Sequence, residues 1–218
     1  MPLLEFQNTF FINDNKTILK DITISINQGD YISVVGPSGS GKSTFLKLCC
    51  HLISATEGTI LYKNKSIMEH NPMDLRKDIA YCFQTPYLFG ETVMDNVSFP
   101  YHLRNIKVDL KRAEELFCQF NLDKEYLKKD IKNLSGGEKQ RIALIRTLLF
   151  MPEILLLDEV TSALDVDNTL IVENVMKSLS QNGTTIIWVT HNPEQSKRNA
   201  HKLLTIEAGE INSLEVLR

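Results

Sequence analysis

The stretch GPSGSGKST at 36–44 directly follows the apolar run YISVV at 31–35. It places three glycines, a lysine and a final Ser-Thr pair within one short segment. A turn needs one or two glycines, so this density indicates that something lies close against the backbone. Gly36, Gly41, Lys42 and Ser43 fit the pattern G-x-x-x-x-G-K-[ST], between an apparent strand and an apparent helix. The alternative is a glycine-rich turn without a ligand.

The chemistry of this segment predicts a phosphate-binding loop for ATP. Glycines allow backbone N–H groups to turn inward as an anion nest, and a helix beginning at Lys42 or Ser43 points its positive end at the same place. Lys42 is expected to reach the β- and γ-phosphates, Ser43 to ligate Mg²⁺ through its hydroxyl, and Thr44 to add a phosphate contact. The loop residues expected to bind nucleotide are Gly36, Pro37, Ser38, Gly39, Ser40 and Gly41.

The second element of the predicted site is EILLLD at 153–158, a buried strand that ends in Asp158 and is followed by Glu159. Successive carboxylates at a strand end point in different directions and can do different work. We expect Asp158 to bind Mg²⁺, directly or through water, and Glu159 to polarise the attacking water. A solvated strand end is the alternative.

The segment LSGGEKQR at 134–141 resembles the signature sequence of ABC ATPases. From the residues alone, Ser135 can cap a helix, with Glu138 completing a capping box, and the glycine amides form a second anion site. The resemblance implies that Ser135, Gly136 and Gly137 contact the γ-phosphate of ATP held by a second copy. Two chains would then enclose two ATP molecules in a homodimer.

Other motifs match the same family in the same order. Gln84 in YCFQTP looks like the glutamine that joins Mg²⁺ to the transport partner, and Asp165 in SALD looks like the residue that crosses the dimer interface. His191, after TTIIWVT, looks like the histidine that contacts the γ-phosphate. Phe11 falls where the family usually places an aromatic ring on adenine, although Phe10 competes for that role and a plain core aromatic is a further alternative.

The order of elements predicts an α/β fold. Strands alternate with helices, which indicates a largely parallel sheet with covered faces. The resemblance implies a P-loop NTPase of ABC type, with a RecA-like core, an N-terminal antiparallel β-subdomain and an inserted helical subdomain. We expect one domain over 1–218, with the core and β-subdomain at 1–90 and 151–218 and the helical subdomain at about 91–150. Val160 replaces the family's usual proline, and we expect it in extended geometry.

Composition narrows the classes of function. The 218 residues are 43% apolar with a net charge of −3, which gives no sign of nucleic-acid binding. The apolar runs are too short to span a bilayer, and MPLLEFQN does not look like a secretory signal. We therefore expect a cytosolic protein. The four cysteines lack metal-site spacing and are expected to be free and mostly buried.

The resemblance is strongest to the FetA-like iron-export ATP-binding subunits of bacteria, over 81–100 and 134–165. It implies an ATPase subunit on the cytoplasmic face of the cell membrane, which works with a separate integral membrane permease and does not touch the cargo. The aromatic segment 84–101, QTPYLFGETVMDNVSFPY, is expected to supply part of the groove for that permease. ATPase subunits for another cargo or for uptake, and soluble ABC ATPases, are the alternatives.

Overall fold

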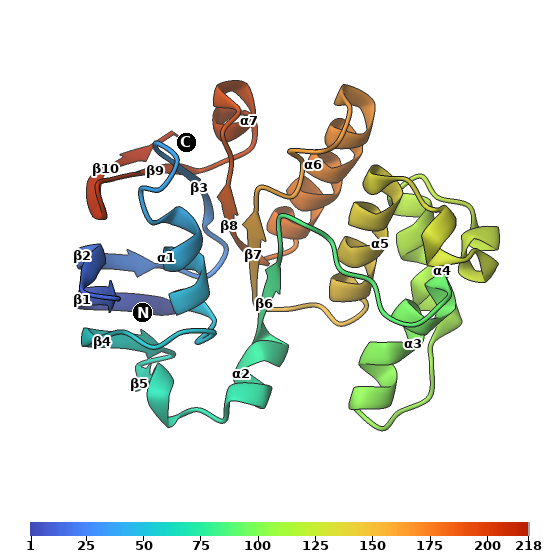
Figure 1. Cartoon of the computed structure of the whole chain (residues 1–218), viewed down its shortest axis with the longest axis horizontal. Coiled ribbons are helices and arrows are strands. Elements are labelled where there is room, and N and C mark those ends of the chain that lie inside the picture. Colours follow the sequence, from blue (N-terminus) through green and yellow to red (C-terminus); the bar gives the residue numbers. More distant parts are fainter. Residues whose placement is uncertain (218) are drawn as a thin grey trace. The chain divides into compact units, whose positions relative to one another are not determined.

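The computed structural model describes residues 1–217, and its backbone contacts divide into two compact units (Figure 1). The first unit contains Met1–Tyr81, Pro152–Glu159 and the chain from Leu179 onward. The second contains Cys82–Met151 and Val160–Ser178. The helical segment expected at about 91–150 falls within the second unit, which also includes 82–90 and 160–178.

Two sheets organise the first unit. The antiparallel sheet has the order β2-β1-β4-β5, and the larger sheet has the order β10-β9-β3-β8-β7-β6. The strands of the first sheet are β1 Leu4–Asn13, β2 Lys16–Ile26, β4 Glu57–Tyr62 and β5 Lys65–Ser66. The strands of the second are β3 Tyr31–Val35, β6 Ile79–Cys82, β7 Ile154–Asp158, β8 Thr185–Val189, β9 Lys202–Glu207 and β10 Glu210–Val216.

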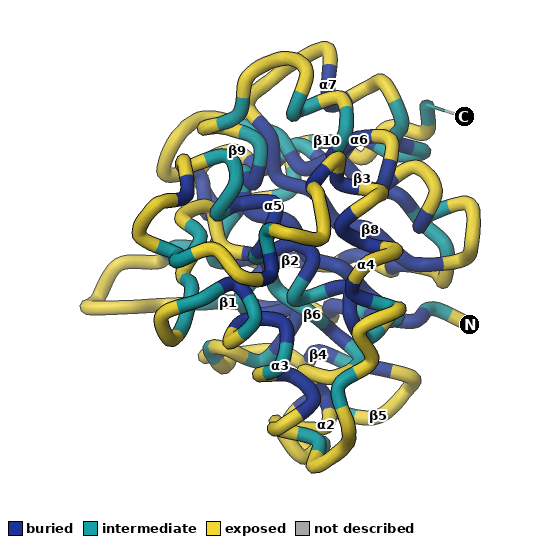
Figure 2. The backbone as a smooth tube through the Cα atoms, turned by 90° about the vertical axis from the view of Figure 1, so that its right-hand side faces the viewer, coloured by how far each residue is buried: buried dark blue, intermediate teal, exposed yellow. Residues whose placement is uncertain are grey.

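The centre of the larger sheet is parallel and buried. Strand β3 pairs in parallel with β8 and β9, and β7 pairs in parallel with β8. All five residues of β7 and of β8 are buried, and Figure 2 shows β3 and β8 in dark blue. Their runs of Val, Ile and Leu are typical of strands that are covered on both faces. The predicted α/β class with an N-terminal antiparallel sheet is confirmed.

Helices are distributed over both units. The helices of the first unit are α1 Lys42–Cys49, α2 Pro72–Asp78 and α7 Pro193–Arg198. The second unit contains α3 Val93–Leu103, α4 Leu110–Gln119, α5 Gly136–Leu148 and most of α6 Val166–Gln181. Short 3-10 turns lie at Ile67–Glu69, Lys124–Lys128 and Ile131–Asn133. None of the helices in residues 1–217 combines the length and the apolar composition that a bilayer span requires.

Sequence reasoning did not identify α2, β6 or β10. Strand β6 has four residues, too few for a clear periodicity, and β10 has mostly exposed, polar residues at the edge of its sheet. Cys49, Cys50 and Cys82 are buried and Cys118 is exposed, and all four are free, as predicted. Burial raises the pKa of the Cys82 thiol to about 11, which keeps it protonated.

Candidate nucleotide site

Three parallel strands bring the predicted site residues of the first unit to one edge of the sheet. In the pairing register, Asp158 lies opposite Val189, and Val189 lies opposite Val34. The phosphate loop therefore begins beside the ends of β7 and β8. Ligands of open α/β sheets bind at this carboxyl edge, where the connections leave the strands.

The loop 36–41 has the backbone of an anion nest. Gly36, Gly39 and Gly41 all have positive φ, at 142°, 76° and 104°. A Cβ atom at Gly36 would lie 2.0 Å from the carbonyl oxygen of Ile206, and one at Gly41 would lie 2.6 Å from Leu19 Cδ2. Only glycine fits at these two positions, because the loop is packed closely against β9 and β2.

The amino end of α1 has no side-chain cap. Gly41 is the N-cap residue and supplies no side-chain hydrogen bond to the first amides. Ser40 Oγ is buried without a hydrogen-bond partner among the described residues. Free amides at a helix start and an unpaired buried hydroxyl are the groups that a bound phosphate satisfies. The loop therefore fits the triphosphate of ATP.

The ammonium group of Lys42 is folded back on this loop. Its Nζ donates to the carbonyl oxygens of Gly36 and Pro37 at 2.9 and 2.8 Å. Burial lowers the pKa of Lys42, while the charges of Glu159 and Asp158 oppose that shift. Lys42 thus places a positive charge at the centre of the loop, close to two carboxylates.

Asp158 is held by two hydroxyl groups. Ser43 Oγ donates to Asp158 Oδ1 at 2.9 Å, and Tyr81 Oη donates to Asp158 Oδ2 at 2.5 Å. Ser43 and Asp158 form the donor set that Mg²⁺ takes beside substrate phosphates, a hydroxyl and a carboxylate. Sequence reasoning missed Tyr81, which comes from β6. The signal available was an amphipathic Tyr three residues before Gln84.

Glu159 and His191 lie together at the end of the sheet. His191 Nε2 is 2.7 Å from Glu159 Oε1. The side chain of His191 is 47% exposed and that of Glu159 is 18% exposed, so solvent reaches the pair. This arrangement can orient the carboxylate and pass a proton between the two groups.

The expectation of extended backbone around Val160 is wrong. Glu159 has a φ of 50°, in the left-handed region, and a turn follows it directly. Strand β7 ends at Asp158, although the amide of Glu159 still donates to the carbonyl of Val189 at 3.1 Å. Such a conformation costs about 1–3 kcal/mol in a residue other than glycine and is common at functional sites. Val160 itself is buried.

The loop that carries His191 is fixed on both sides. Thr190 Oγ1 donates to Gln195 Oε1 at 2.5 Å and accepts from the amide of Asn192 at 3.1 Å. Asn192 in turn caps α7 by accepting from the amides of Glu194 and Gln195. The ring of His191 is therefore held at the strand end by a compact turn.

Phe11 and Phe10 are both partly buried on β1. Phe11 packs against the hydrophobic core, which suits the core-aromatic alternative. It is also paired in register with Leu19, the residue that packs against Gly41 of the phosphate loop. Its position is thus one strand away from the loop, and the adenine contact stays a prediction.

In the second unit, Ser135 caps α5 as expected. Its hydroxyl accepts from the amide of Glu138 at 3.2 Å, and Glu138 Oε2 accepts from the amide of Ser135 at 2.7 Å. Glu138 Oε1 accepts from Tyr126 Oη at 2.5 Å. These bonds, that of Tyr126 first, hold the pKa of Glu138 below its usual range. The capping-box interpretation is confirmed.

The remaining predicted residues also lie in the second unit. Gly136 has open space where a Cβ would stand, whereas a Cβ at Gly137 would lie 3.1 Å from Leu164 Cδ2. Asp165 accepts from the amide and the side chain of Asn168 at the start of α6, and these bonds lower its pKa. Gln84 is exposed, two residues after β6 ends. The contacts predicted for these four residues with the nucleotide, the metal or the dimer interface stay predictions.

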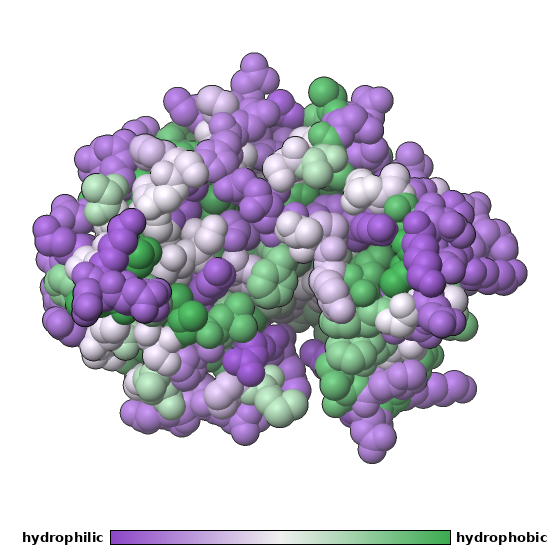
Figure 3. All heavy atoms as spheres, viewed as in Figure 1, coloured by the Kyte–Doolittle hydropathy of each residue, from purple (hydrophilic) through white to green (hydrophobic). Residues whose placement is uncertain are grey.

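The aromatic segment 84–101 is partly core and partly surface. Val93 and Tyr101 are buried, whereas Tyr87 is 70% and Phe99 37% exposed. The ring of Phe89 packs between the rings of Tyr87 and Phe99, and its centroid lies 5.4 Å from that of Tyr87 and 4.7 Å from that of Phe99. In Figure 3, green hydrophobic groups gather over α3, where Leu103 is also 62% exposed.

Comparisons with known proteins agree with this geometry. The sequence matches the ABC transporter family over residues 19–162. It is 42% identical over 213 residues to the "Probable iron export ATP-binding protein FetA" of Escherichia coli strain K12, covering 96% of this chain and 94% of that protein. It is 37% identical to the "Phosphate import ATP-binding protein PstB" of Saccharolobus solfataricus, covering 92% of this chain and 82% of that one.

A solved ATP-binding cassette has the same fold. Its structure is a dimer in a post-hydrolysis state bound to ADP and Pi, with a TM-score of 0.88, 29% identity and 99% of each chain covered. The family match, the relatives and the fold lead to one conclusion. The chain belongs to the ABC transporter family, as an ATP-binding subunit that hydrolyses ATP.

Proposed function

We propose that the phosphate loop and the carboxylates after β7 of one copy, together with the amino end of α5 of a second copy, catalyse ATP hydrolysis when two copies of the chain meet. The 2.9 Å contact between Ser43 and Asp158 carries this proposal, since it joins the phosphate loop to the carboxylate at the end of β7. In the proposed cycle the amides of 36–41 bind the phosphates, and Lys42 leaves the loop carbonyls to pair with the β- and γ-phosphates.

Ser43 and Asp158 would hold Mg²⁺, with Gln84 as a further ligand. The ion would neutralise phosphate charge during transfer to water. Glu159 accepts the proton of the attacking water, and His191 keeps the carboxylate of Glu159 oriented and contacts the γ-phosphate. The left-handed backbone at Glu159 supports this assignment, because strained residues concentrate at catalytic sites.

The signature helix would complete the site of the other copy. The amino end of α5 exposes Ser135 and Gly136, and its dipole favours an anion. Ser135 keeps its own hydroxyl proton available, because in the capping box its oxygen only accepts. Asp165 would contact the opposite copy. ATP then stabilises the dimer through contacts that only the triphosphate offers.

The partner outside the dimer would be an integral membrane permease, which places the chain on the cytoplasmic face of the membrane. The exposed rings of Tyr87 and Phe99, with Leu103, support this, because an apolar patch on a surface suits a short amphipathic helix. The segment is firmly held, since Asn96 bonds both the amide and the carbonyl of Phe89 at 2.8 Å.

Iron is the proposed cargo and export the proposed direction, because the relative from Escherichia coli is named as a probable iron export protein. Another cargo is the second candidate, because relatives that are named for phosphate import and ergothioneine transport also match over most of the chain.

The test is affinity purification of the chain from its native membranes, with co-purifying proteins identified by mass spectrometry. A polytopic membrane protein in equal amount supports the transporter role, and recovery with soluble factors alone contradicts it. The complex is then reconstituted in vesicles with external ATP and Fe²⁺. In vesicles whose ATPase subunits face outward, export appears as ATP-driven movement of Fe²⁺ into the vesicle. Loss of this movement in Lys42→Ala supports the export proposal. ATP hydrolysis without Fe²⁺ movement contradicts the iron proposal.

A further inference from the structure

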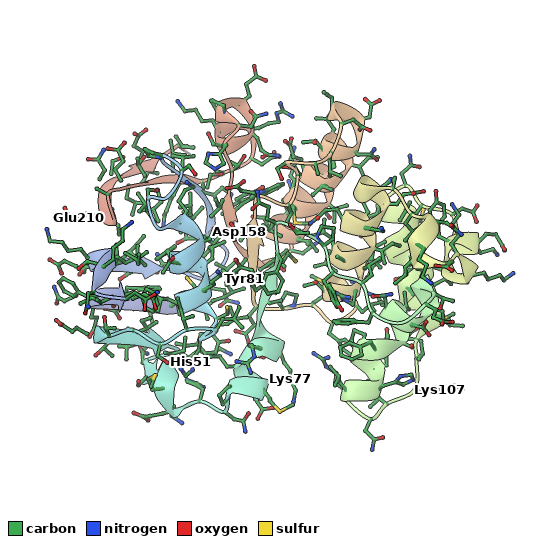
Figure 4. All side chains as sticks on the ribbon, viewed as in Figure 1. His51, Lys77, Tyr81, Lys107, Asp158 and Glu210 are labelled. Atoms are coloured by element: carbon green, nitrogen blue, oxygen red, sulfur yellow. The ribbon has the colours of Figure 1, made fainter. Side chains whose placement is uncertain are left out.

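Tyr81 makes a contact with the metal-binding carboxylate that the proposed cycle does not use. Its hydroxyl donates to Asp158 Oδ2 at 2.5 Å, while Asp158 Oδ1 accepts from Ser43. Figure 4 labels Tyr81 and Asp158, which come from the neighbouring strands β6 and β7. An O–H···O⁻ bond of this length is charge-assisted and about twice as strong as a neutral one.

The two hydroxyls cannot have the same role. Ser43 is expected to turn its oxygen lone pairs toward a metal, and it then no longer needs to donate to Asp158. Tyr81 is not a member of the proposed metal donor set, and its ring is fixed by packing against the hydrophobic core. The bond from Tyr81 can therefore persist while the bond from Ser43 is exchanged for a metal contact.

We propose that Tyr81 is a positioning residue, which holds Asp158 Oδ2 so that Oδ1 faces Ser43 and the metal. Asp158 is only 6% exposed, so water cannot replace a lost partner easily. Without the phenol, the carboxylate can rotate and its second oxygen is left poorly satisfied. This inference rests on the proposed Mg²⁺ site at Ser43 and Asp158.

Tyr81→Phe removes the hydroxyl and keeps the ring. The measurement is the equilibrium affinity of the isolated chain for a fluorescent ATP analogue, once with excess Mg²⁺ and once with EDTA, so that no turnover is needed. The ratio of the two affinities reports the contribution of the metal. We expect Tyr81→Phe to lower this ratio about 10-fold, as typical for residues that orient metal ligands, with the EDTA affinity unchanged.

Tyr62→Phe is the matched control. Tyr62 Oη also lies 3.2 Å from two carboxylates, those of Asp78 and Glu153, in the same unit but away from the phosphate loop. It should leave the ratio at the wild-type value. Asp158→Asn tests the metal site itself and should remove most of the effect of Mg²⁺.

The outcomes separate the two claims. If Asp158→Asn loses the Mg²⁺ effect but Tyr81→Phe keeps the wild-type ratio, the inference about Tyr81 is wrong. The proposed metal site is then still supported. An Asp158→Asn variant with an unchanged ratio overturns both. An equal loss of affinity with Mg²⁺ and with EDTA in Tyr81→Phe also overturns the inference, because it means general damage to the loop.

Discussion

Two helices of this protein begin at glycine-rich segments, and their amino ends are built differently. Helix α1 starts after Gly41, in left-handed conformation, and receives no side-chain cap. Helix α5 starts after Ser135 and has a complete capping box with Glu138. The first end depends on a ligand to satisfy its amides, while at the second end the capping box already satisfies the amides of Ser135 and Glu138. We infer that α1 is the primary phosphate site and that α5 adds its contact to an anion already held elsewhere.

The largest expected effect is at the uncapped end. Lys42→Ala removes the charge at the centre of the loop, and ATP hydrolysis should fall to background in a phosphate-release assay. Lys47→Ala, in the last turn of the same helix, is the control and should stay close to wild type. A wild-type rate in Lys42→Ala would show that the loop does not bind the reacting phosphates.

The next effect concerns Glu159. Glu159→Gln should bind ATP but slow hydrolysis by about 10²–10⁴-fold, the range for a lost general base. The stalled chain should accumulate as an ATP-bound dimer, seen as a doubling of mass by light scattering. Glu153→Gln, at the other end of the β7 segment beside Lys63, is the control. Normal turnover in Glu159→Gln would exclude it as the base.

A smaller effect is expected at the amino end of α5. Helix α3 offers a comparison, because it also begins with a capping box. Thr92 and Asp95 form a capping box in the same unit as Ser135 and Glu138. Ser135→Ala and Thr92→Ala should each cost about 1 kcal/mol of unfolding free energy. Only Ser135→Ala should also weaken the ATP-bound dimer, by about 10-fold or more, since it removes a donor to a charged group.

Both variants are compared in the Glu159→Gln background by sedimentation at several concentrations. Nucleotide affinity of the monomer should be unchanged in each. If Ser135→Ala and Thr92→Ala dissociate equally, the hydroxyl of Ser135 acts only as a helix cap.

The smallest effect is electrostatic. The pKa of Glu138 is lower folded than unfolded, so its charged form contributes stability above about pH 4.5, its usual value, and this is lost as pH falls through the folded pKa. Compared with Glu138→Gln, the wild type should gain about 0.3–1 kcal/mol at pH 6.5 and less at pH 3, because the gain declines as the pH falls through the lowered pKa. Denaturant unfolding at the two pH values measures this difference. An equal gap at both would contradict the charge argument.

The sequence is sufficient to predict the site residues that lie within recognisable motifs. It is not sufficient for residues that reach the site only through the pairing of strands. Lys42, Asp158 and Glu159 follow from a glycine pattern and a buried strand with an acidic end. Tyr81 could not be found in this way, because its contact depends on β6 lying next to β7 in the sheet. The left-handed backbone of Glu159 could not be predicted for a related reason, because no glycine marks this position and the extended geometry expected at Val160 gives no sign of it.

Gly209 also has a consequence for the order in which the protein is made. Its amide donates to the carbonyl of Ser40, and its own carbonyl accepts from the amide of Lys20. The phosphate loop is therefore tied to a hairpin that is synthesised long after it. A domain generally folds as a unit, so this tie forms only when the β9–β10 hairpin has left the ribosome. The strand before the loop, β3, also pairs with the late strands β8 and β9, so ATP capture should become possible only late in synthesis.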